Sequence, residues 1–121
     1  MNYNKFGLTD EFISRIGFGT WGLSGTSYGF IDEQIAIQTL QMAYEHGINF
    51  FDSADLYGNG RSEEILSKAL NQYRNKIYLA TKGGSLPHSG FVMPQDFSVS
   101  YLDYALKNSL KRMRTEYVDL Y

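Results

Sequence analysis

Apolar residues along this chain follow two patterns, short continuous runs and repeats at helical spacing. The helical repeats predict three helices, over residues 32–47, 62–73 and 98–113. The short runs predict four strands, over residues 15–20, 48–52, 76–82 and 117–121. Ahead of the first strand, residues 3–14 predict a small β-hairpin.

Residues that favour helix ends stand at the boundaries of these repeats. Asp32 and Ser98 are placed where a side chain can accept the first free N–H groups of a helix. Gly47 is placed where a glycine often ends one. The spacing of apolar residues in the last helix predicts one buried face. This face consists of Leu102, Ala105, Leu106, Ser109, Leu110 and Met113. Loops are predicted over residues 23–31, 52–60 and 83–97, and loops as long as the last often have a functional role.

The order of the elements after the hairpin, β-α-β-α-β-α-β, predicts parallel strands joined by helical crossovers. Two architectures have this order, a doubly wound open sheet and a closed eight-stranded barrel. A closed barrel needs about 250 residues. The 121 residues would form one α/β domain, residues 1–121, equivalent to the N-terminal half of a (β/α)8 TIM barrel.

Composition narrows the class of protein. Hydrophobic residues make up 43% and charged residues 20% of the chain, which is typical of a globular protein. The net charge of −2 gives no basic field for nucleic acid or an anionic membrane. There is no cysteine, no signal-peptide pattern and no long apolar run, so the expected location is the cytoplasm. The acidic side chains and histidines show no metal-ligand spacing.

Gly17, Gly19 and Gly22 match the G-x-G-x-x-G pattern of dinucleotide-binding Rossmann units. In such a unit the glycines open a helix that holds the pyrophosphate. Here no helical repeat begins before Asp32, and the position about 20 residues beyond the motif, where an acid is expected, falls near Met42. The glycines are therefore better explained as shaping a strand end and a tight loop.

Asp52, Tyr57 and Lys82 form the strongest candidate for a catalytic site. Asp52 and Lys82 end two successive predicted strands, and Tyr57 lies five residues after Asp52. The carboxyl ends of parallel strands meet on one face, where active sites are built. A tyrosine hydroxyl titrates at about pH 10, and a nearby ammonium makes it a better acid. A carboxylate can balance that ammonium, so the three groups could protonate a carbonyl oxygen.

Each of these residues also has a structural explanation. Asp52 could cap the following loop, Tyr57 could be a packed ring, and Lys82 could be solvated. The two histidines are weaker candidates. His46 stands near a helix C-terminus, where a cation suits the dipole. His88 lies in the long loop, where it could be solvated or could line a pocket.

Four segments together resemble the aldo-keto reductase family: GFGTWGL, NFFDSADLYGNGRSEEILSKAL, IYLATKGG and SLKRMRTEYVDLY, which begin at residues 17, 49, 77 and 109. The resemblance implies a (β/α)8 barrel that reduces aldehydes or ketones with NADPH or NADH. It makes Asp52, Tyr57 and Lys82 three of the four catalytic residues. It also implies that Gly19, Thr20, Trp21 and Asp52 lie at the cofactor.

The family's fourth catalytic residue is a histidine that follows the DLY segment after two further residues, beyond Tyr121. The resemblance places the family's main contacts to the cofactor's adenosine and phosphates in the second half of the barrel. The 121 residues alone are therefore expected to be incomplete or inactive. The sheet edge at residues 117–121 would be open, which predicts an unstable chain, self-association through that edge, or a fragment of a longer product. A non-enzymatic barrel subunit that binds nicotinamide, and a remnant without function, are the alternatives.

Overall fold

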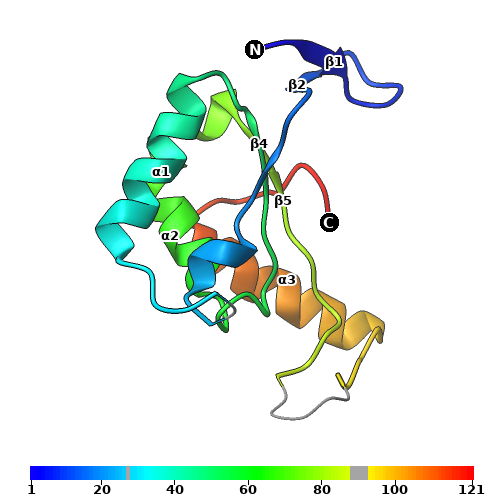
Figure 1. Ribbon diagram of the computed structural model, residues 1–121. Coiled ribbons are helices and arrows are strands. Elements are labelled where there is room, and N and C mark those ends of the chain that lie inside the picture. The colour runs from blue at the N-terminus through cyan, green and yellow to red at the C-terminus, as the bar shows by residue number, and fades with distance from the viewer. Residues whose placement is uncertain (27, 88–92) are drawn as a thin grey trace.

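The structure is a computed structural model that describes residues 1–26, 28–87 and 93–121 (Figure 1). Its strands are β1 (Tyr3–Lys5), β2 (Phe12–Ser14), β3 (Phe18–Gly19), β4 (Phe50–Asp52) and β5 (Tyr78–Ala80). Its helices are α1 (Glu33–Glu45), α2 (Arg61–Leu70) and α3 (Val99–Met113), with 3-10 turns η1 (Trp21–Ser24) and η2 (Asn71–Lys76). The predicted hairpin is confirmed, because β1 and β2 pair antiparallel.

The order of the strands distinguishes the two architectures. Strands β3, β4 and β5 pair in parallel in that order, with Phe51 opposite both Phe18 and Leu79. The next segment adds beside β5, where Leu120 bridges Ala80 in parallel. A doubly wound sheet reverses direction and would set a strand on the other side of the first one. A continuous order without reversal is the order of a barrel.

The predicted strand at residues 117–121 is the main difference from expectation, because it is reduced to the single bridge at Leu120. The Asp119 carboxylate accepts the Leu79 N–H at 2.8 Å, a position that a backbone carbonyl would occupy in a regular ladder. Arg74 holds that carboxylate in turn, with its Nη2 2.8 Å from Asp119 Oδ2. A side chain therefore completes this part of the sheet edge.

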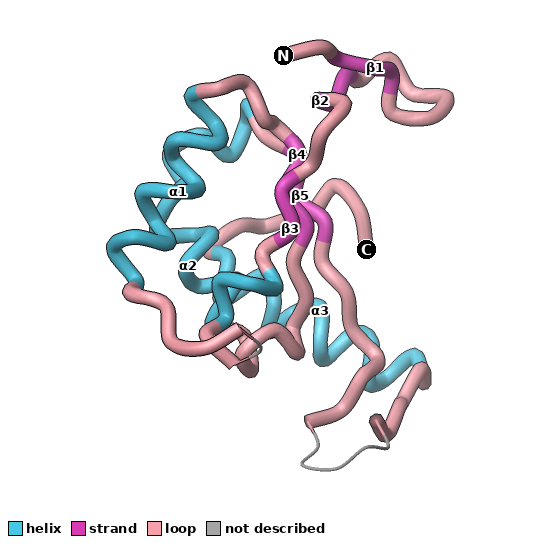
Figure 2. The backbone as a smooth tube through the Cα atoms, viewed as in Figure 1, coloured by secondary structure: helices cyan, strands magenta, loops and turns pink. Residues whose placement is uncertain are grey.

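The three helices form a layer beside the sheet, with α2 between α1 and α3 (Figures 1 and 2). The largest buried apolar side chains come from α1, α2, α3 and the strand β4, and they include Leu40, Phe51, Ile65, Leu66, Leu70 and Met113. Of the predicted face of α3, Ala105, Ser109 and Met113 are buried and the three leucines are half-buried. Within the described residues, no helix has the length and apolar content needed to cross a bilayer.

The predicted caps are confirmed. The Asp32 carboxylate accepts the N–H groups of Gln34 and Ile35, and the Ser98 hydroxyl accepts that of Tyr101. Gly47 follows α1 at a φ of +91°, a conformation that favours glycine. Helix α2 ends at Leu70, earlier than predicted, and continues as the 3-10 turn η2.

The hairpin covers the amino-terminal ends of the strands. The Phe6 ring packs 5.9 Å from Phe50 and 6.4 Å from Tyr78, which begin β4 and β5. The Tyr78 hydroxyl donates to the Glu11 carboxylate, and this bond, with burial and the Glu11 charge, raises the pKa of Tyr78 to about 12. The carboxyl ends of the strands lie away from the hairpin (Figure 2).

Replacing Asp32 by Ala is expected to lower the free energy of unfolding by about 1 kcal/mol, because two N–H groups of α1 lose their acceptor. Urea unfolding of the protein measures the change. Gln38→Ala, at an exposed position in the same helix, is the control and should change stability little. Equal effects of the two substitutions would mean that the cap does not stabilise α1.

Candidate active site

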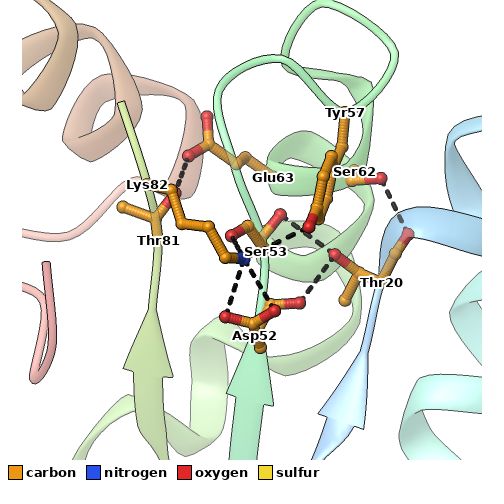
Figure 3. A network of polar contacts seen from close by, with 8 residues as sticks. All are labelled: Thr20, Asp52, Ser53, Tyr57, Ser62, Glu63, Thr81 and Lys82. Atoms are coloured by element: carbon orange, nitrogen blue, oxygen red, sulfur yellow. Dashed lines mark hydrogen bonds and ion pairs between the residues drawn. The ribbon is translucent and has the colours of Figure 1, made fainter. Parts of the chain in front are cut away.

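Asp52, Tyr57 and Lys82 lie together at the carboxyl ends of β4 and β5 (Figure 3). The Lys82 ammonium donates to both carboxylate oxygens of Asp52, at 2.8 and 2.7 Å. It also lies 3.2 Å from the Tyr57 hydroxyl oxygen and 2.7 Å from the Ser53 carbonyl oxygen. One lysine therefore contacts the carboxylate and the phenol at the same time, as the sequence pattern predicts.

The cluster is accessible from outside. The side chain of Lys82 is 50% exposed and that of Asp52 36% exposed, so a ligand can reach both. The ammonium also lies 4.9 Å from the centre of the Tyr57 ring, within the range of a cation–π contact. Both carboxylate oxygens of Asp52 bind Lys82, so capping of the following loop does not explain the position of Asp52.

The other residues expected near a cofactor line the end of β3. Gly19 pairs with Asp52 in the sheet, and a Cβ atom on Gly19 would meet no atom within 4 Å. Trp21 is 50% exposed, with its ring 6.3 Å from that of Tyr57. Free space and an exposed indole therefore stand beside the Asp–Lys–Tyr cluster.

Thr20 is buried, unlike a residue that contacts a ligand from the surface. It is 0% exposed, and its hydroxyl lies 3.1 Å from the Asp52 carbonyl oxygen and 3.0 Å from Ser53 Oγ. Its side chain therefore joins β3 to β4 and could act on a ligand through Asp52 and Ser53.

The first turn of α2 holds this region in place, which the sequence pattern did not indicate. The Ser62 hydroxyl donates to the Thr20 carbonyl oxygen at 2.9 Å, and the Ser62 N–H donates to the Tyr57 carbonyl oxygen at 3.2 Å. Both the end of β3 and the loop that carries the phenol are thus bonded to one residue, and Figure 3 shows the bond from Ser62 to Thr20.

Glu63, also in the first turn of α2, holds the end of β5 in place. It is 0% exposed and accepts the Thr81 hydroxyl at 2.5 Å and Arg112 Nε at 2.6 Å. Thr81 directly precedes Lys82, so the network joins α2, the end of β5 and α3 next to Lys82. A signal existed in the sequence: Glu63 is on the helical stripe of Leu66 and Leu70, where a charge needs a partner.

One of the two histidines, His46, lies among the described residues, and it is separate from this cluster. His46 ends α1, where its Nδ1 donates to the Met42 carbonyl oxygen at 2.8 Å, in agreement with the helix-terminus explanation. His88 lies outside the described residues. Among the residues that are described, no three acidic or histidine side chains gather as metal ligands would.

Parallel strands in continuous order, with an Asp–Lys–Tyr cluster at their carboxyl ends, define part of a (β/α)8 barrel with a polar site at its mouth. Residues 15–121 match the profile of the Aldo/keto reductase family. The chain therefore belongs to the aldo/keto reductase family, a family of oxidoreductases.

Curated relatives agree with this assignment. Aldo-keto reductase YhdN of Bacillus subtilis (strain 168) is 39% identical over 123 residues, which cover 100% of this chain and 37% of YhdN. A protein named probable voltage-gated potassium channel subunit beta, from Arabidopsis thaliana, is 34% identical over 126 residues, which cover 99% of this chain and 36% of that protein. The chain spans little more than a third of the length of either relative.

Solved structures confirm the barrel fold. The holo form of aldo-keto reductase AKR11C1 from Bacillus halodurans matches with a TM-score of 0.85 at 36% identity, over 100% of this chain and 39% of that one. An aldo/keto reductase from Klebsiella pneumoniae, solved with NADP and acetate, matches with a TM-score of 0.69 at 25% identity, over 89% of this chain and 34% of that one. A related protein of the same fold therefore binds NADP.

Proposed function

We propose that the protein reduces aldehydes or ketones to alcohols with a nicotinamide cofactor, and that Tyr57 is the proton donor. The observation that carries this proposal is the position of Lys82 Nζ, 3.2 Å from the Tyr57 oxygen and within 2.8 Å of both Asp52 oxygens. A lysine that is held by a carboxylate and directed at a phenol can stabilise the phenolate left when the phenol protonates a carbonyl oxygen.

The residues of the chain act on the proton. Reduction of a carbonyl needs one hydride at carbon and one proton at oxygen. The Tyr57 hydroxyl delivers the proton, and the Lys82 ammonium stabilises the phenolate that remains. Asp52 keeps the ammonium in place by binding it through both carboxylate oxygens. Solvent then returns the proton to Tyr57.

The cofactor is expected beside the same cluster. NADPH, or NADH in its place, supplies the hydride when bound. The free space in front of Gly19 suits the approach of a flat ring, and the exposed Trp21 indole offers a face for it. Gly19, Trp21 and Asp52 would contact the cofactor directly, and Thr20 would support them from behind β3. We favour NADPH because a related structure holds NADP.

The direct test uses a completed barrel that contains residues 1–121 as its first part, hereafter the full-length protein. An aromatic aldehyde is added, and the oxidation of NADPH is followed by its absorbance. The proposal expects aldehyde-dependent loss of NADPH and formation of equimolar alcohol. The same assay with NADH determines the cofactor preference. An absence of turnover with a panel of aldehydes and ketones, from protein that binds NADPH, would contradict the proposal.

A second candidate function is that of a nicotinamide-binding subunit of a larger assembly. The 34% identity to a protein named as a channel subunit, over 99% of this chain, favours it. Such a subunit would bind NADPH and a partner with little or no turnover. The two functions therefore differ in the assay above, and tight NADPH binding without reduction would favour the subunit.

The cellular location and the partners of the protein are also proposals. We place it in the cytoplasm because the composition lacks cysteine and the cofactor is a cellular nucleotide. Small carbonyl compounds are the proposed partners, and neither nucleic acid nor a membrane surface is expected at a net charge of −2. Self-association through the edge at Leu120, and the inactivity of the 121 residues alone, stay predictions.

A further inference from the structure

Two adjoining cavities open at the mouth of the strands. The smaller, of about 220 Å³, is lined by the proposed proton donor Tyr57 and by Lys82. The larger, of about 350 Å³, lies between the loop after β4 and the helix α3. Both are lined by Asp55, Leu56 and Ser85, so these residues stand at the passage from one to the other. A ligand that reacts at Tyr57 could extend past Asp55 into the larger cavity.

Asp55 is fixed in this position by the backbone. Its N–H donates to the Lys82 carbonyl oxygen at 3.1 Å, which ties it to the end of β5 beside the proposed acid. Burial and the nearby Glu63 carboxylate raise the pKa of Asp55, against the Leu56 N–H and the Arg112 guanidinium, which lower it. Within the described part of the chain, no side chain donates a hydrogen bond to this half-buried carboxyl group.

The larger cavity is polar, and Asp55 and Arg112 are the charged residues among its described lining. Two tyrosines, Tyr101 and Tyr104, and two asparagines, Asn59 and Asn108, line it together with Arg112. The guanidinium is already paired, with Nε 2.6 Å from the buried Glu63. What remains for a ligand is a carboxyl group, amide and phenol groups and the faces of aromatic rings, which suit uncharged hydroxyl groups and the carbon atoms between them.

We propose that Asp55 is a specificity-determining residue that accepts a hydrogen bond from a hydroxyl group of the substrate, so that the preferred substrates are uncharged hydroxylated aldehydes or ketones. The carbonyl group lies at Tyr57 and the hydroxylated remainder of the molecule lies along Asp55 toward α3. This inference rests on the proposed reductase function and adds a substrate class to it.

The test compares two aldehydes of three carbons, glyceraldehyde and propanal, which differ in their hydroxyl groups. Full-length protein is expected to reduce glyceraldehyde with a kcat/KM about tenfold or more above that for propanal, since a hydrogen bond to a charged group discriminates by about this factor. Asp55→Ala should remove the preference by raising KM for glyceraldehyde about tenfold, and should leave kcat and the propanal values within about twofold.

Asp103→Ala is the matched control, because it removes an exposed carboxylate on α3 that pairs with Lys107 outside both cavities. It should leave both substrates unchanged. Asp55→Asn keeps the size and one acceptor, should restore part of the preference, and shows that a loss in the Ala variant is not a loss of folding. Equal kcat/KM for the two aldehydes, or a preference that survives Asp55→Ala, overturns the inference and leaves the reductase function standing. Failure to reduce either aldehyde overturns both.

Discussion

Replacing Tyr57 by Phe is expected to lower kcat for aldehyde reduction by a factor of about 10² to 10⁴, the usual contribution of a positioned general acid. The substitution removes the hydroxyl that lies 3.2 Å from Lys82 Nζ and leaves the ring. The ring contacts to the ammonium at 4.9 Å and to Trp21 at 6.3 Å can therefore persist. Steady-state assays with NADPH and one aldehyde measure the effect.

Measuring NADPH binding distinguishes a variant that has lost only its proton donor from one whose binding site is disrupted. The dissociation constant of NADPH, measured by fluorescence titration, should change by no more than a few-fold in Tyr57→Phe, because the variant retains the groups proposed to hold the cofactor. Tyr117→Phe is the matched control: it removes a hydroxyl from a ring that packs against Arg74, away from the cluster. Undiminished turnover in Tyr57→Phe would show that another group donates the proton.

The second large effect concerns stability. Arg112→Ala is expected to lower the free energy of unfolding by about 3–5 kcal/mol, because it leaves the buried Glu63 charge without its cation. Glu63 is 0% exposed and Arg112 Nε lies 2.6 Å from it. The arginine also packs closely on Gly60, which precedes α2 at a φ of +92°. Its removal therefore loosens the contact between α2 and α3 as well as the ion pair.

Chemical unfolding of the full-length protein, followed by circular dichroism, measures this change. Lys107→Ala is the control, since the Lys107–Asp103 pair is largely exposed, and loss of an exposed pair within one helix changes stability by about 0.5 kcal/mol or less. A loss near 0.5 kcal/mol in Arg112→Ala would mean that the Glu63–Arg112 pair contributes no more to stability than an exposed ion pair.

Local chemistry explains why much of the fold was predictable. Asp32, Gly47 and Ser98 each satisfy a need of their own helix end, so a short stretch of sequence contains the information. The convergence of Asp52 and Lys82 was predictable for another reason, because parallel strands place their carboxyl ends on one face whatever the details of packing.

The features that were not predicted depend on partners distant in the sequence. The predicted strand at residues 117–121 is reduced to the bridge at Leu120 because the Asp119 side chain accepts the Leu79 N–H. No strand pattern in the sequence reveals this bond. Glu63 pairs with Arg112, 49 residues further along the chain. The burial of Thr20 likewise depends on Ser53, in the loop after β4, and on Ser62, in α2.

The position of Asp55 at the site also depends on parts of the chain that are distant in the sequence. Three residues after Asp52, it reads in the sequence as one more polar residue of a loop. Its place between two cavities depends on how the loop lies against α3 and on the bond to the Lys82 carbonyl. Its significance could therefore be inferred from the folded chain and not from the sequence pattern.

The central claim is that Tyr57 gives the proton, and a single turnover of the Tyr57→Phe variant tests it most directly. The NADPH complex is mixed rapidly with an aldehyde, so that the chemical step is measured apart from product release. The variant should oxidise its bound NADPH about 10² to 10⁴ times more slowly than the unsubstituted full-length protein, because the hydroxyl that lies 3.2 Å from Lys82 Nζ is gone. Equal single-turnover rates in the two proteins would contradict the account and assign the proton to a different group.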